Sequence, residues 1–179
     1  RKSVSYLLKK TEKHEKQKTA DRICERVLRN SKYVPLTTKV AADHWLMLAI
    51  KEGDAEAFAE RLGSMANRDI DAAHLQNMLV KYSYAFLKLD NTEAINEVVR
   101  VGRKLSRAIH NEEDIEQLRW ALFDMNCHVQ DFDAALAILN NQENAPTQRI
   151  ELLKNNILAH QAMKEGKSDE AVRRFRKFM

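Results

Sequence analysis

The segment Gly166-Lys167-Ser168-Asp169-Glu170-Ala171 decides the fold, because it has the composition of a tight turn that opens a helix. Glycine permits the backbone conformation of such a turn, and the acidic pair suits the positive end of a helix dipole. Phe175 and Phe178 follow at helical spacing and give that helix an apolar face. The segment therefore predicts two helices joined by a short turn.

The same turn-then-helix pattern recurs at three earlier places along the chain. These are Gln130-Asp131-Phe132-Asp133-Ala134-Ala135 with Leu139, Leu89-Asp90-Asn91-Thr92-Glu93-Ala94 with Val98, and Gly53-Asp54-Ala55-Glu56-Ala57-Phe58 with Leu62. If Phe58, Ala94, Ala135 and Ala171 are equivalent, the units are spaced by 36, 41 and 36 residues. Self-similarity at such a period is typical of stacked helical repeats.

The rest of the sequence favours an all-α protein. It contains only two prolines and four glycines, and no segment alternates apolar and polar residues between turn residues. The spacing predicts helices at about 2–30, 37–52, 54–66, 70–89, 92–109, 112–129, 132–141, 147–165 and 168–178. Candidate N-cap residues are Asp54, Asp69, Asn111, Asp131 and Ser168.

This pattern resembles the tetratricopeptide repeat family over about residues 36–179. The last unit matches best, because Ala159 and Ala162 supply small positions of a first helix, and Gly166, Ala171 and Phe175 supply the turn and the second helix. The turn glycine of the family is replaced by Leu89 and Gln130 in two units. The resemblance implies a right-handed α-solenoid of about four stacked antiparallel hairpins with a concave groove.

Large apolar residues at helical spacing are expected to form the core of such a stack. They are Trp45, Leu48, Met78, Tyr82, Phe86, Trp120, Phe123, Leu136 and Leu139. The repeat frame also predicts which first-helix residues line the groove and bind a partner. They are Met47, Lys51, Ser83, Gln117, Trp120, Asp124, His128, Asn156, His160 and Lys164, together with Asp43 and Leu87.

Charge divides the chain into basic ends and a mildly acidic middle. Residues 1–22 hold eight Lys/Arg and three Asp/Glu, residues 164–179 hold six and three, and the remaining residues hold 16 and 20. Residues 1–35 are therefore expected to be a basic helical arm, or the end of a preceding repeat, before the repeat domain at 36–179. RNA binding through this arm is an alternative function, although a net negative middle repels a phosphate backbone.

The sequence shows no pattern typical of an enzyme, so we expect no catalysis, metal or cofactor. It lacks GxSxG, GxGxxG, HExxH and P-loop motifs, and its six histidines include no i, i+4 pair. Cys24 and Cys127 lie far apart outside any CxxC motif, which indicates buried thiols in a reducing compartment. The longest apolar run, Trp45 to Ile50, is too short to cross a bilayer.

Together these features predict a non-enzymatic protein-interaction module or scaffold that binds a partner peptide or helix in its groove. A third possibility is an assembly subunit that contacts partners, further repeats or a second copy through the ends of the array, where Phe175 and Phe178 are expected to be exposed. We expect a cytoplasmic protein or the cytosolic part of a larger one. The sequence opens on Arg1 and not on Met, so it leaves open whether a signal, anchor or further domain precedes it.

Overall fold

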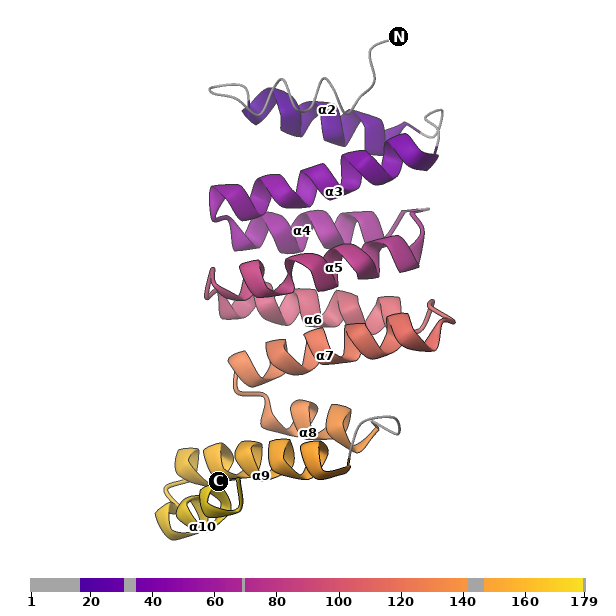
Figure 1. The fold of residues 1–179 in the computed structure, drawn as a ribbon. Coiled ribbons are helices and arrows are strands. Elements are labelled where there is room, and N and C mark those ends of the chain that lie inside the picture. Colours follow the sequence, from indigo (N-terminus) through magenta and orange to yellow (C-terminus); the bar gives the residue numbers. More distant parts are fainter. Residues whose placement is uncertain (1–16, 31–34, 69, 142–146, 179) are drawn as a thin grey trace. The chain divides into compact units, whose positions relative to one another are not determined.

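The computed structural model describes residues 17–30, 35–68, 70–141 and 147–178, and all regular secondary structure in these ranges is α-helical (Figure 1). The helices of the described ranges are α2 (Gln17–Arg29), α3 (Pro35–Glu52), α4 (Ala55–Ala66), α5 (Ala72–Leu87), α6 (Thr92–Ser106), α7 (Glu112–His128), α8 (Phe132–Asn140), α9 (Thr147–Lys164) and α10 (Ser168–Phe178). The predicted all-α class is confirmed. The first part of the predicted helix 2–30 lies outside the described residues.

Short polar side chains begin several of these helices, as the sequence predicted. The Asp54 carboxylate accepts from the Ala57 N–H at 2.8 Å, and the Asp131 carboxylate accepts from the Ala134 N–H at 3.2 Å. Two predicted caps differ. Asp71 caps α5, whereas the predicted Asp69 lies outside the described residues, and Ser168 is the first residue of α10.

The chain divides into two compact units, Arg1–Leu118 and Arg119–Met179. In unit 1, α2 packs on α3, α3 on α4, α4 on α5 and α5 on α6; α3 also packs on α5, and α4 on α6. The centre of this unit is aromatic: Phe58 stacks on Phe86 with ring centroids 4.7 Å apart and meets the edge of Tyr82 at 6.3 Å. Of the predicted core residues, Trp45, Leu48, Met78, Tyr82 and Phe86 are buried here.

Unit 2 holds the second part of α7 and helices α8 to α10, and α9 packs on both α8 and α10. Its core cluster comprises Phe123, Ala135, Leu139, Ile150 and Ile157. Trp120 and Leu136, both predicted to be core, are partly buried and pack against that cluster. Both units therefore bury the apolar faces that the sequence marks.

The four turns that carry the sequence pattern share one backbone geometry. Each contains a residue with left-handed φ, namely Gly53 (69°), Asp90 (52°), Gln130 (59°) and Gly166 (75°). The N–H group of each donates to the carbonyl three residues earlier, at 3.2 Å to Ile50, 3.1 Å to Leu87, 3.1 Å to Cys127 and 3.0 Å to Met163. Two of the turns achieve this without glycine.

This geometry corrects the alignment of the repeated sequence pattern at the turn around Asp90. The Ile95 N–H donates to Asn91 O at 3.0 Å, which is the position that Phe58, Ala135 and Ala171 occupy in their own helices. Ile95 is therefore the equivalent residue, not Ala94, and the spacings are 37, 40 and 36 residues. The frame was wrong because Asp90, and not Leu89, takes the glycine position; aspartate tolerates left-handed φ better than most residues do.

Candidate functional site

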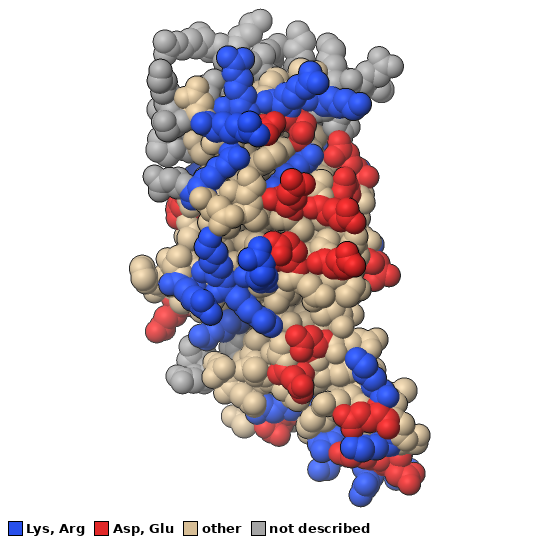
Figure 2. Space-filling model, turned by 180° about the vertical axis from the view of Figure 1, so that it is seen from behind, with Lys and Arg blue, Asp and Glu red and all other residues tan. Residues whose placement is uncertain are grey.

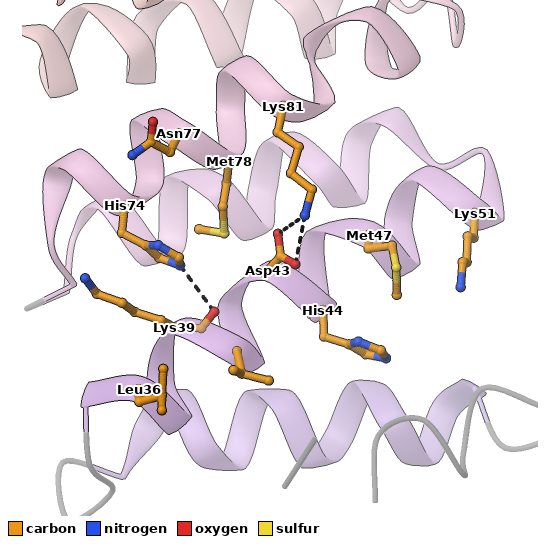
Figure 3. Close-up of a pocket in the computed structure, with 11 residues that line it drawn as sticks. Leu36, Lys39, Asp43, His44, Met47, Lys51, His74, Asn77, Met78 and Lys81 are labelled. Atoms are coloured by element: carbon orange, nitrogen blue, oxygen red, sulfur yellow. Dashed lines mark hydrogen bonds and ion pairs between the residues drawn. The ribbon is translucent and has the colours of Figure 1, made fainter. Parts of the chain in front are cut away.

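A groove of about 620 Å³ opens on unit 1 between α3 and α5 (Figure 3). From α3 it is lined by Leu36, Lys39, Val40, Asp43, His44, Met47 and Lys51, and from α5 by His74, Asn77, Met78 and Lys81. The lining follows helical spacing, because residues three and four apart share one face of a helix. Packing of α3 on α5 brings these two faces together.

The inner surface of the groove is apolar. Met78 is almost completely buried and Met47 and Val40 are half-buried, whereas Leu36 keeps 73% of its surface exposed. Leu36 lies toward one end of the groove and Met47 toward the other (Figure 3), and both are suitable contacts for apolar partner side chains, because the flexible methionine thioether adapts to different shapes.

An ion pair crosses the groove from α5 to α3. Lys81 Nζ lies 2.8 Å from Asp43 Oδ1 and 3.0 Å from Asp43 Oδ2, and the Tyr82 hydroxyl donates to Asp43 Oδ1 at 3.1 Å. The hydrogen bond to Asp43 raises the pKa of Lys81, so this lysine stays charged at neutral pH.

A second set of contacts joins α3 to the start of α5. Lys39 Nζ donates to Asp71 Oδ2 at 2.9 Å, and this hydrogen bond lowers the pKa of Asp71. His74 Nε2 lies 3.3 Å from the backbone oxygen of Lys39. Asp71 also caps α5, so these contacts join α3 to the first turn of the other helix that lines the groove.

Of the predicted partner-binding residues in unit 1, the structure brings Asp43, Met47 and Lys51 together in this groove. Ser83 is half-buried, and its hydroxyl donates to Val80 O at 2.8 Å within α5. Gln117 is exposed on α7. Neither Ser83 nor Gln117 lines the groove, and Leu87 does not line it either.

The other predicted binding residues belong to unit 2. Three of them, Trp120, His160 and Lys164, take part in contacts that involve an aromatic ring. The Arg149 guanidinium lies 4.9 Å from the Trp120 ring centre, the His160 ring meets the edge of Phe175 at 5.3 Å, and Lys164 Nζ lies 5.8 Å from the Phe132 ring centre. Asn156 is half-buried on α9.

Asp124 and His128, also predicted to bind a partner, are exposed on α7. Neighbouring atoms nevertheless desolvate the Asp124 carboxyl, and this raises its pKa.

Most of the α5 side of the groove was not predicted from the sequence. Met78 is buried, as predicted for a core residue, but its side chain also forms part of the groove. Asn77 and Lys81 are polar residues four apart, which marks an exposed stripe. That stripe, followed by the exposed Tyr84, was the signal available in the sequence.

Within the described ranges, no group of three His, Cys, Asp or Glu side chains is arranged to hold a metal ion. In the same ranges no helix combines the length and the apolar character needed to span a bilayer. Comparison of the chain with protein-family models, curated proteins and solved structures finds no match. The resemblance to tetratricopeptide repeats therefore remains a prediction from the residue pattern.

Proposed function

We propose that this chain is a non-enzymatic protein-interaction module that binds a partner peptide or helix in the groove between α3 and α5. The observation that carries the proposal is the groove itself, which combines apolar side chains with lysine, histidine and asparagine side chains and is crossed by the Lys81–Asp43 ion pair. Apolar contact surrounded by polar groups is typical of surfaces that bind peptides.

We further propose a right-handed solenoid of hairpins, similar to tetratricopeptide repeats, as the scaffold of this site. Two observations support it: the four turns share one backbone geometry, and in unit 1 alternate helices pack on each other as well as neighbours. In such a stack the exposed sides of the first helices face a groove, which is where α3 and α5 would lie.

The charge on the other side of unit 1 weakens the alternative of RNA binding. Figure 2, seen from behind, shows acidic and basic side chains gathered separately on that face. Acidic residues stand in the first turns of α4 and α6, as Glu56 and Glu93, and basic residues in the last turn of α6, as Arg103 and Lys104. This arrangement complements the helix dipoles, and it does not form the continuous basic surface that a phosphate backbone favours.

One observation favours a second candidate, assembly through the end of the chain. On unit 2, Met163 of α9 and Val172 of α10 keep 58% and 49% of their surface exposed. Apolar side chains exposed on neighbouring helices provide a surface that another copy or another domain can cover.

Photo-crosslinking separates these functions. Benzoylphenylalanine is placed in turn at Met47 in the groove, at Arg22 on α2 and at Met163 on α9, and each protein is irradiated in a lysate of its source cells with and without nuclease. The proposal predicts a nuclease-resistant protein adduct from position 47 only. A nuclease-sensitive adduct from position 22 alone supports RNA binding, and an adduct of twice the chain mass from position 163 alone supports self-assembly; either result contradicts the proposal.

A matched pair of variants tests whether the groove itself is needed. Asn77 lines the groove and Asn96 lies on α6, and both are exposed. Asn77→Trp fills the groove and should abolish the adduct from position 47, whereas Asn96→Trp should leave it unchanged. An adduct that survives Asn77→Trp would place the partner elsewhere.

A further inference from the structure

The geometry points to a preferred partner for the α3/α5 groove: a peptide segment in which carboxylate side chains alternate with apolar ones. This inference rests on the proposed function and adds the chemistry of the ligand. It follows from the side chains that line the groove, which include the ammonium groups of Lys39, Lys51 and Lys81 but only one carboxylate, that of Asp43.

The three lysines are distributed along the groove, as Figure 3 shows. Lys39 and Lys51 are twelve residues apart on α3, so their backbone positions are separated by about 18 Å along the helix axis. Lys81 reaches into the space between them from α5. An extended peptide of about six residues covers this length at roughly 3.3 Å per residue.

Alternation follows from the shape of an extended chain. Successive side chains of such a peptide point to opposite sides, so one set can contact Val40, Met47 and Met78 while the long lysine side chains reach the other set. Carboxylates at about 7 Å intervals, every second residue, would pass near ammonium groups without leaving the apolar surface.

The existing ion pairs can exchange for ligand carboxylates at small cost. The Lys81–Asp43 pair has side chains that are 55% and 37% exposed, and the Lys39–Asp71 pair has side chains that are 39% and 51% exposed. Pairs this accessible to solvent are weak and exchange readily with other partners, so a ligand carboxylate competes with water-exposed partners and not with a buried bridge.

The groove suits other ligands less well. A basic peptide would place its cations against three lysines. Among the residues that line the groove, none is Phe, Tyr or Trp, the side chains on which unpaired bases stack.

Selection from a random peptide library tests the inference and requires no partner to be identified first. A displayed library of twelve-residue peptides is selected on the parent chain, on Asn77→Trp, on the triple variant Lys39→Gln/Lys51→Gln/Lys81→Gln, and on the control Arg100→Gln/Arg103→Gln/Arg107→Gln. The control removes the same charge from exposed positions at and just after the end of α6. Circular dichroism and thermal unfolding establish that all four proteins are folded.

We expect parent and control to enrich peptides rich in Asp and Glu together with Leu, Ile, Met or Phe, and Asn77→Trp to enrich none of these peptides. The Lys39→Gln/Lys51→Gln/Lys81→Gln variant should still select apolar residues but no longer acidic ones, and it should bind the best peptide at least tenfold more weakly than the parent. The affinity of the control for that peptide should stay within twofold of the parent value. Enrichment that needs the groove but shows no acidic bias overturns this inference and leaves the proposed function standing. If the parent enriches no peptides, or only peptides that Asn77→Trp also enriches, both this inference and the proposed function are overturned.

Discussion

Arg61 is the residue on which the junction of α2, α3 and α4 depends. Its guanidinium lies 2.8 Å from Asp21 Oδ1, donates to the Trp45 backbone oxygen at 2.8 Å and stands 5.5 Å from the centre of the Trp45 ring. Trp45 Nε1 in turn donates to Asp21 Oδ1 at 2.6 Å. Only 13% of the Arg61 side chain is exposed, whereas 36% of the Asp21 side chain is, so the guanidinium depends on these partners for most of its hydrogen bonds.

Arg61→Ala should therefore lower the free energy of unfolding by about 1–2 kcal/mol, because the Trp45 carbonyl loses a side-chain donor and Asp21 keeps only the hydrogen bond from Trp45 Nε1. Urea unfolding followed by circular dichroism measures the change. Arg100→Ala is the matched control: Arg100 pairs with Glu97 while 73% exposed, so its replacement should leave the free energy of unfolding nearly unchanged. Equal losses in the two variants would show that the Arg61 contacts contribute nothing special.

Both cysteines are free and shielded, and this makes a second prediction at the residue scale. Burial raises the pKa of the Cys24 thiol to about 12 and that of Cys127 to about 11. Both thiols are then protonated in the folded chain at pH 8, and Cys24 should react with a disulfide reagent at least about a hundredfold more slowly than in urea. Because its pKa is raised in the folded state, the stabilising contribution of Cys24 is complete below about pH 9 and is lost as pH rises toward 12. Rapid labelling of Cys24 in the folded protein would contradict its burial.

The turn between paired helices is the feature that recurs along the chain. Comparing the predicted turns with the structure shows which features of the fold the sequence could predict. Helix ranges could be predicted because caps such as Asp54 and Asp131 and the apolar spacing mark them independently. The predicted position of the turn around Asp90 was wrong by one residue, because Asp90 adopts left-handed φ and no glycine marks that position in the sequence. Met47 and Lys51 were predicted for the groove, but its α5 side depends on how two helices meet, which spacing within one helix does not encode.

Two glycines of different backbone geometry should respond oppositely to alanine. Gly53 has φ of 69° with open space around it, so Gly53→Ala should cost about 1 kcal/mol through backbone strain alone. Gly63 lies within α4, and a Cβ there would meet Glu97 Oε1 at 3.6 Å and Val101 Cγ2 at 3.7 Å, which are ordinary contacts. Gly63→Ala should therefore stabilise by about 0.5–1 kcal/mol. Thermal unfolding of both variants compares them directly, and changes of the same sign would refute this account of the turn.

At the scale of the whole molecule, the net charge of the chain does not predict where charged side chains gather. The chain carries a net charge of +4, but acidic and basic side chains stand at opposite ends of helices such as α6 in unit 1. The groove between α3 and α5 instead gathers lysines around an apolar surface. Composition alone pointed to a basic arm as the charged feature, because the groove forms only when residues about 35 positions apart are packed together.

Methionine-methyl NMR is the measurement that tests the groove most directly. Met47 and Met78 line it, whereas Met65 and Met125 are fully buried elsewhere and Met163 is exposed on α9. Titration of ¹³C-methyl-methionine protein with the most enriched peptide should shift the resonances of Met47 and Met78. The resonances of Met65, Met125 and Met163 should stay in place. In Asn77→Trp, the same peptide should shift none of these resonances. Shifts confined to Met163, or shifts that persist in Asn77→Trp, would contradict binding in the α3/α5 groove.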